Sequence, residues 1–282
     1  MPNSKISRTA PETQAESHWS PPSGVLGELV EQARFRAVSL PPTADLDAIG
    51  ESRRKIPKLS VALDRPSVAV IAEIKRSSPS RGVINSEIDS SVQARRYEAG
   101  GAAAISVLTE PARFGGSDAD LAQVSDAVKL PILKKDFHVT EAQIAHAAMS
   151  RASAALIIVR AVSPAELIHL ANAAKRAGLE IVYEVRDERE LERAVEAGAQ
   201  LVGVNNRNLE TLEIDRDTVG RIIPLVPREC IAIAESGYST REEIEDAATA
   251  GANAVLVGSS LSASRDPEAS VRALSSVTRR SR

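Results

Sequence analysis

Two charged side chains lie close together at the end of the apolar stretch VAVIAEIK, residues 68–75. Residues 68–72 are apolar and rich in β-branched side chains, which predicts a strand buried on both faces. Because residues i and i+2 of a strand point the same way, Glu73 and Lys75 share one face at its carboxyl end. Burying an acid and a base costs desolvation free energy, so the two form either a structural ion pair or a site of proton transfer.

Acidic, basic and amide side chains also follow the other apolar runs of the chain. Packing alone gives no reason to place a Glu or a Lys at so many strand ends, so the pattern favours a catalytic site. Acids and bases in one pocket of low dielectric shift each other's pKa values and can pass protons in both directions. A lysine there can also form a Schiff base with a carbonyl substrate, so an aldolase-like route stays open. The groups are Glu73, Lys75, Glu110, Lys134, Lys135, Asp136, Arg160, Glu184, Asn205, Asn206, Arg207 and Glu235.

Eight short apolar runs alternate with amphipathic stretches from residue 68 onward. Glycine-containing segments at 98–101, 196–199 and 249–252 precede three of the runs and suit helix C-caps. Eight βα units in succession predict a (β/α)8 TIM barrel with an N-terminal helical extension. A doubly wound open sheet is the alternative, but it usually has fewer strands and often a GxGxxG motif, which is absent here. The expected strands begin at residues 68, 103, 131, 154, 180, 201, 230 and 254.

The chain before the first strand is expected to have two sections. Residues 1–22 are polar, contain Pro and Ser and show no period, which predicts a disordered leader. Residues 23–66 are expected to form the helical extension, since Val25, Leu29 and Ala33 recur at helical spacing. The barrel domain is then expected to span residues 67–278.

The composition suits a soluble globular protein with one large domain or two small ones, and it argues against several other classes of protein. The 282 residues are 43% hydrophobic and 26% charged, with a formal net charge of -3. Their basic residues are dispersed, so no nucleic-acid partner is expected. No apolar run reaches the roughly 18 residues of a membrane span, and the first residues lack a secretory signal, so we expect a cytoplasmic protein with no membrane partner. The scattered histidines support neither a metal site nor a Ser-His-Asp triad.

The last two expected strands end in residues typical of an anion site. Ser236 and Gly237 follow the seventh strand, and Gly258 and Ser259 follow the eighth. Glycine lets the backbone approach a ligand closely, and loops at these two positions of a barrel commonly bind phosphate. Ser78 and Arg207 can add donors, so the substrate is expected to be phosphorylated.

Six segments at strand ends form an ordered set: IAEIKRSSPS (71–80), ISVLTEPARFGGS (105–117), PILKKDF (131–137), VGVNNRNLETLEID (202–215), IAESGYST (233–240) and VLVGSSL (255–261). This set, over about residues 65–262, resembles the motifs of the indole-3-glycerol phosphate synthase family of tryptophan biosynthesis. The resemblance implies a barrel with a helical extension over its mouth and a carboxy-lyase that needs no cofactor and no metal. Its substrate would be the small phosphorylated anthranilate derivative 1-(2-carboxyphenylamino)-1-deoxyribulose 5-phosphate.

The resemblance also implies roles for individual residues. Lys135 would be a general acid for the substrate carbonyl, while Lys75 would bind the anthranilate carboxylate and is a candidate acid for dehydration. Glu73 and Glu184 would accept or relay protons, and the division of steps between the lysines and glutamates stays open. Asn205, Glu235 and Ser236 would orient the substrate. Phosphate would lie on Ser78, Arg207, Gly237, Gly258 and Ser259, and the aromatic ring against Phe114, Phe137, Leu156, Leu209 and Leu212.

The residues before 65 match the family less well than the rest. Trp19 and the basic segment 53–55 are candidates to close over the substrate.

Phosphoribosylanthranilate isomerase and the tryptophan synthase alpha chain are alternative phosphate-binding barrels, but neither explains the Glu-x-Lys and Lys-Lys-Asp-Phe motifs together. A sensor or scaffold would lack a catalytic group, and none is missing. Barrels of this kind can pair through exposed helices, so a monomer or a homodimer is expected.

Overall fold

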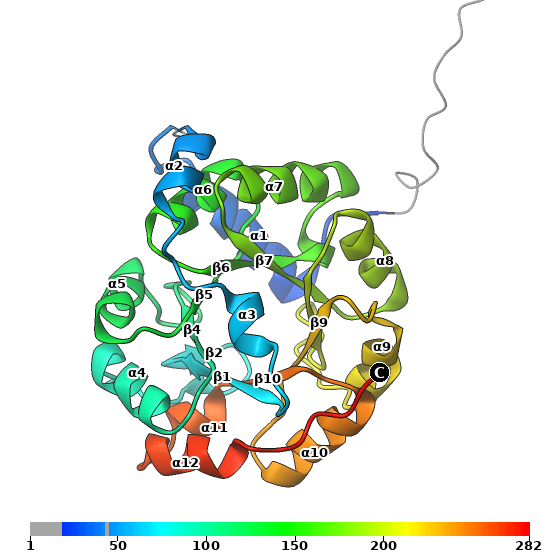
Figure 1. Ribbon diagram of the computed structural model, residues 1–282. Coiled ribbons are helices and arrows are strands. Elements are labelled where there is room, and N and C mark those ends of the chain that lie inside the picture. Colours follow the sequence, from blue (N-terminus) through cyan, green and yellow to red (C-terminus); the bar gives the residue numbers. More distant parts are fainter. Residues whose placement is uncertain (1–18, 43–44) are drawn as a thin grey trace, which may run out of the picture.

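The computed structural model describes residues 19–42 and 45–282. Eight parallel strands form a closed barrel in the order β1-β10-β9-β8-β7-β6-β5-β4, and β4 pairs with β1 to complete the ring (Figure 1). The predicted (β/α)8 barrel is therefore confirmed, and the open doubly wound sheet is excluded. The strands are β1 (Ala69–Ile74), β4 (Ala104–Leu108), β5 (Ile132–Lys135), β6 (Ala154–Ile158), β7 (Glu180–Val185), β8 (Leu201–Asn205), β9 (Ile231–Glu235) and β10 (Ala254–Val257).

Every barrel strand is followed by at least one helix, and the helices surround the ring (Figure 1). Thr140, Ser163 and Thr240 each start a helix with a capping box, which satisfies backbone N–H groups at the helix start. Gly251 has φ +96° at the end of its helix, as the predicted glycine C-cap requires. The helices are α4 (Ser90–Ala99), α5 (Asp118–Ala127), α6 (Glu141–Met149), α7 (Pro164–Arg176), α8 (Glu188–Glu196), α9 (Asp217–Ile222), α10 (Arg241–Ala250), α11 (Ser259–Ser262) and α12 (Pro267–Leu274), with 3-10 turns η2 (Val159–Ala161) and η3 (Ile223–Leu225).

Small and branched aliphatic side chains fill the core. Strands β1, β4, β6 and β8 are buried along their whole length, as expected for a parallel sheet covered on both faces. Tyr97 of α4 is the largest fully buried side chain, and its hydroxyl donates to the carbonyl oxygen of Glu73 at 3.2 Å. The strand that carries Glu73 and Lys75 is therefore fixed on its outer side as well as within the sheet.

The helices before the barrel lie at its two ends. Helix α1 (Gly24–Ala37) contacts the mouth, where the backbone N–H of Val25 donates to the carbonyl of Glu210 at 3.3 Å. Helices α2 (Leu46–Ser52) and α3 (Leu59–Leu63) lie at the other end, where Glu180 at the start of β7 accepts a hydrogen bond from Leu59 N at 2.6 Å. In Figure 1, α3 lies in front of the ring of strands and α1 lies behind it.

Arg53 belongs to the basic segment 53–55, which was a candidate to close over the substrate. It does not lie at the barrel mouth, so the expectation is wrong for this residue. Arg53 is buried, and its guanidinium donates to the carbonyl oxygens of Ala148 and Ala152. Ala148 lies in the last turn of α6 and Ala152 in the loop before β6, at the end of the barrel opposite the mouth. Arg53 therefore fixes the extension to the closed end of the barrel.

Residues 1–18 of the predicted leader, which was expected to span residues 1–22, lie outside the described residues. In the part that follows, Trp19 Nε1 donates to the carbonyl of Arg160 at 3.3 Å, and Arg160 Nη1 donates to the carbonyl of Ser20 at 2.6 Å. The limits expected for the extension (23–66) and the barrel domain (67–278) stay predictions. Within residues 19–42 and 45–282, no helix is both long enough and apolar enough to cross a membrane.

A candidate active site at the barrel mouth

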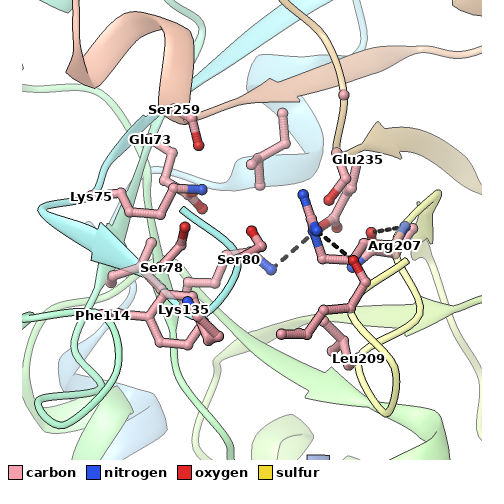
Figure 2. A pocket seen from close by; sticks show the side chains of 18 of the residues that line it. Glu73, Lys75, Ser78, Ser80, Phe114, Lys135, Arg207, Leu209, Glu235 and Ser259 are labelled. Carbon is pink, nitrogen blue, oxygen red and sulfur yellow. Dashed lines mark hydrogen bonds and ion pairs between the residues drawn. The ribbon is translucent and has the colours of Figure 1, made fainter. Parts of the chain in front are cut away.

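A cavity of about 250 Å³ lies at the carboxyl ends of the strands, where active sites of this fold occur. All the site residues proposed from the sequence line it, and Figure 2 shows several of them around the same space. The structure thus brings them together, while their roles stay predictions. They are Glu73, Lys75, Ser78, Phe114, Lys135, Phe137, Leu156, Glu184, Asn205, Arg207, Leu209, Leu212, Glu235, Ser236, Gly237, Gly258 and Ser259.

Lys135 lies at the centre of a group of buried charges. It ends β5, and its Nζ is 3.0 Å from Glu184 Oε2 on β7 and 3.2 Å from Glu235 Oε2 on β9. Asn205 Nδ2, on the strand between these two glutamates, donates to Glu184 Oε1 at 3.0 Å. Curvature of the barrel therefore places one ammonium group beside two carboxylates from strands that are not its neighbours.

The surroundings of Lys135 determine the charge that it carries. Burial would lower its pKa, but the carboxylates of Glu184, Glu235 and Glu73 together raise it. Burial raises the pKa of Glu235, and so does the neighbouring Glu184, although Lys135 opposes the change. Lys135 is thus held as an ammonium ion that can give a proton. A Schiff base requires the neutral amine, so this charge state argues against Lys135 as a Schiff-base lysine.

Glu73 and Lys75 form the ion pair expected from their spacing on β1. Lys75 Nζ is 2.8 Å from Glu73 Oε1, and Ser106 Oγ donates to Glu73 Oε2 at 3.2 Å. Both side chains are little exposed, at 3% for Glu73 and 16% for Lys75. A Cβ atom at Gly258 would lie 2.3 Å from Glu73 Oε1, so the absence of a side chain there leaves room for the pair. Gly258 therefore has a steric role besides its predicted part in phosphate binding.

The loops predicted to bind phosphate lie at one side of the cavity. Ser236 and Gly237 both have positive φ, +66° and +94°, and Ser259 begins the short helix α11. A left-handed backbone at a residue other than glycine is uncommon and tends to occur at functional sites. Ser78 Oγ is buried, and among the described residues it has no hydrogen-bond partner, which suits a donor reserved for a ligand.

Aromatic and aliphatic side chains line another part of the cavity. The rings of Phe114 and Phe137 are tilted by 44°, with centroids 6.3 Å apart. Leu212 has φ +68°, and its carbonyl accepts a hydrogen bond of 2.6 Å from Arg207 Nη1. Arg207 therefore shapes the loop that carries Leu209 and Leu212, besides lining the cavity itself (Figure 2).

The structure adds cavity residues and removes others that the strand-end pattern had included. Val25 and Leu29 of α1 line the cavity, but their helical spacing did not reveal what they pack against. Tyr238 also lines it and had no signal of its own. Conversely, Lys134 points outward to pair with Asp118. Alternation of side chains along β5 explains why Lys135 faces the cavity and Lys134 does not.

A partly buried ion pair attaches α1 to the mouth. Arg36 contacts Asp136 through two hydrogen bonds, Nη2 to Oδ1 at 2.7 Å and Nη1 to Oδ2 at 3.1 Å. Thr109 Oγ1 donates to the same carboxylate at 2.8 Å. Burial would raise the pKa of Asp136, but Arg36 and His138 outweigh it and lower the pKa to about 2. The charged form of Asp136 therefore stabilises the folded protein.

We expect the Asp136→Asn substitution to lower the free energy of unfolding in a pH-dependent way. Since the pKa of Asp136 is lower in the folded than in the unfolded chain, its stabilisation is present above pH about 4 and is lost as the pH falls towards about 2. The difference from wild type should be about 2 kcal/mol near neutral pH and shrink on acidification. Urea unfolding across this range measures it. The exposed Asp126, paired with Arg151, is the control, and its replacement by Asn should have little effect at any pH. A constant difference for Asp136→Asn would contradict the argument.

The fold and this site define a (β/α)8-barrel enzyme with an acid–base centre of lysines and glutamates. The family model of indole-3-glycerol phosphate synthase matches residues 29–274. The chain is 44% identical to indole-3-glycerol phosphate synthase of Streptomyces griseus subsp. griseus over 250 residues, 88% of this chain and 93% of that protein. It is 50% identical to that of Nocardioides sp. over 209 residues, 74% of this chain and 80% of that protein. The chain therefore belongs to the indole-3-glycerol phosphate synthase family, and the predicted carboxy-lyase of tryptophan biosynthesis is confirmed.

Similar solved structures bear on the fold alone. The 3-hexulose-6-phosphate synthase of Salmonella typhimurium has a TM-score of 0.59 and 16% identity, over 73% of this chain and 96% of that one. Thiamine phosphate pyrophosphorylase of Pyrococcus furiosus has a TM-score of 0.56 and 15% identity, over 77% of this chain and 96% of that one. The barrel architecture is thus shared with proteins of little sequence similarity.

Proposed function

We propose that the protein converts 1-(2-carboxyphenylamino)-1-deoxyribulose 5-phosphate into indole-3-glycerol phosphate, carbon dioxide and water. Membership of the family supports the substrate and the product. The observation that carries the mechanism is the Lys135 ammonium between Glu184 and Glu235, in a cavity that the Phe114–Phe137 pair also lines. We also propose that the protein acts in the cytoplasm, as a monomer or a homodimer.

The cavity offers a surface for each part of this substrate. The aromatic ring lies against Phe114, Phe137 and the neighbouring leucines, where apolar burial favours it. The phosphate lies on the loops after β9 and β10, with Ser78 as an additional donor. Lys75 contacts the carboxylate of the anthranilate ring. These three attachments press the ring carbon that bears the carboxylate against the carbonyl carbon, which is the arrangement that ring closure needs.

Ring closure and decarboxylation form the first part of the reaction. The aromatic carbon attacks the carbonyl carbon while Lys135 gives a proton to the carbonyl oxygen, which becomes a hydroxyl group. A positive charge already fixed in a buried site stabilises the negative charge that develops on this oxygen. The bond to the carboxylate then breaks, carbon dioxide leaves, and the electron pair restores the aromatic ring.

Loss of water completes the reaction. The hydroxyl group needs a second proton to leave, and Lys75, which lines the cavity, supplies it. A base removes a proton from the ring carbon that is bonded both to the nitrogen and to the carbon bearing the hydroxyl. Glu184 serves as this base, and Glu73 holds Lys75 in place. Asn205 fixes Glu184 through the hydrogen bond to its other oxygen, and Glu235 orients Lys135.

A fluorescence assay for indole-3-glycerol phosphate tests this function directly. Wild-type protein is expected to form the fluorescent product, and Glu184→Gln is expected to lose most of the rate while it still binds inorganic phosphate. Glu188→Gln, an exposed substitution at the start of α8, is the matched control and should keep the rate. Folded wild-type protein without turnover would overturn the proposal for this chain.

A further inference from the structure

Helix α1 has no cap within its own sequence. The side chain of Ser23, the residue before its first turn, makes no capping hydrogen bond, and that turn contains no acidic residue. The first backbone N–H groups of a helix have no acceptors within the helix, and the partial positive charge at its start favours a nearby anion. An acceptor from elsewhere in the chain is therefore needed to hold the start of α1.

Glu210, in the loop between β8 and α9, supplies this acceptor. Its Oε1 accepts a hydrogen bond from Ser23 N at 2.7 Å and from Ser23 Oγ at 3.2 Å, and its backbone carbonyl accepts from Val25 N at 3.3 Å. Gly24 has φ +57°, and a Cβ atom there would lie 2.4 Å from the same carbonyl oxygen, so only glycine suits this close approach. The loop after β8 therefore caps α1.

Arg160, which follows β6, attaches this cap to the barrel. Its Nη2 is 3.0 Å from Glu210 Oε1, and its Nη1 donates to the carbonyl of Ser20, in the segment that leads into α1. Trp19 Nε1 donates to the carbonyl of Arg160 itself. Arg160 was one of the charged groups at the strand ends, and the proposed mechanism gives it no part. Its contacts hold the start of α1 and the Glu210 loop together.

The capped helix and the capping loop both contribute to the apolar lining of the active-site cavity. Helix α1 provides Val25 and Leu29, and the loop provides Leu209 and Leu212. The hydrogen bond from Val25 N to the carbonyl of Glu210, the residue after Leu209, joins the two parts directly. The aromatic ring of the substrate lies against these leucines in the proposed function, on which this inference rests. The position of α1 then determines how closely the cavity encloses the ring.

We propose that Glu210 is a positioning residue that caps α1 and so holds Val25 and Leu29 in place over the aromatic ring of the substrate. Glu210 does not line the main cavity, so it acts through α1 and not on the substrate itself. The ring is enclosed both before and during the reaction. A contact of this kind contributes equally to the ground state and the transition state, so its loss should raise KM and leave kcat nearly unchanged.

The Glu210→Ala variant tests the cap because it removes the carboxylate. KM for the substrate should rise by about tenfold, whereas kcat should change by less than about twofold. The inhibition constant of inorganic phosphate should also stay within about twofold of wild type. Trp19 is the only tryptophan of the chain, and it lies next to Arg160, so its fluorescence reports the position of this segment. Without substrate, acrylamide should quench Trp19 more readily in the variant than in wild type.

Three further variants separate the cap from other roles of the loop. Glu210→Gln keeps an oxygen that accepts from Ser23 but loses the charge, so its KM should lie between those of wild type and Glu210→Ala. Glu213→Gln, an exposed substitution in the same loop, should match wild type in KM and in quenching. Gly24→Ala disturbs the same contact from the helix side, so its effect on KM should not add to that of Glu210→Ala.

An unchanged KM of Glu210→Ala, in an enzyme that turns over, would overturn the proposal. So would a fall in kcat at constant KM, because Glu210 would then act on the chemistry. An equal weakening of phosphate binding would indicate a distorted mouth, and a raised KM without greater quenching of Trp19 would show that α1 had not moved; either result would also overturn it. Folded wild-type protein without activity would instead refute the proposed function itself.

Discussion

Replacing Lys135 by methionine is expected to lower kcat/KM by a factor of about 10²–10⁴, the usual contribution of a positioned general acid. Methionine fills a similar volume but carries no proton, so the carbonyl oxygen gains no stabilisation as the ring closes. The substrate should still bind, because its ring and phosphate contact other residues of the cavity. Steady-state fluorescence kinetics measure kcat and KM separately, and the loss should appear mainly in kcat.

Lys134 provides the matched control for Lys135. It is the preceding residue of the same strand and is also buried, but it pairs with Asp118 outside the barrel. Lys134→Met should therefore reduce the free energy of unfolding while leaving kcat/KM close to wild type. If both lysine variants lost activity equally, the loss would reflect a damaged strand, and Lys135 would not be the acid.

The Lys135→Met variant should also show a characteristic pH dependence of stability. Burial and the charge of Glu184 already raise the pKa of Glu235 to about 8 in the wild-type protein, and Lys135 opposes this rise. Without the ammonium group, the pKa of Glu235 should rise further. Groups with a raised folded pKa lose stability as the pH increases through the range between the two pKa values. The difference between the two proteins appears above the wild-type value of about 8, so urea unfolding should show a larger deficit relative to wild type at about pH 9 than at about pH 6.

The sequence was sufficient to predict the barrel because its signals are local. Each buried strand appears as a short run of branched aliphatic residues, and glycines such as Gly251 end the helices between them. Closure of the barrel then follows from repetition, since eight βα units need no further information. The position of the N-terminal extension, by contrast, could not be predicted from local sequence signals. Arg53 looks like a basic surface residue in the sequence, and only its contacts with Ala148 and Ala152 show that it lies at the closed end.

The same distinction applies to the site. Glu73 and Lys75 could be paired from the sequence because two residues on one strand face are separated by a fixed distance. The pairing of Lys135 with Glu184 and Glu235 could not, since it depends on the barrel diameter and on rotamers of three strands.

Gly203 of β8 is expected to be a positioning residue for Glu235. A Cβ atom there would lie 2.2 Å from Glu235 Oε1 and 3.2 Å from Val182 Cγ1, too close for either to remain in place. Gly203→Ala should displace the Glu235 carboxylate and weaken its ion pair with Lys135. A displacement of about 1 Å at a catalytic group can lower kcat by about 100-fold. The overpacked barrel should also lose about 1–3 kcal/mol of unfolding free energy. Kinetics and urea unfolding of the variant measure the two effects.

A shorter acid at position 235 tests whether Gly203 acts through Glu235. In the double variant Gly203→Ala/Glu235→Asp, the aspartate leaves room for the new methyl group, so activity should equal that of Glu235→Asp alone. Gly220→Ala is the control, since a Cβ there meets no atom within 4 Å and should leave kcat unchanged. If Gly203→Ala lowered kcat by the same factor in the Glu235→Asp background as in wild type, the two positions would be independent. The absence of a side chain at position 203 would then matter only for packing of the barrel and not for proton transfer at Lys135.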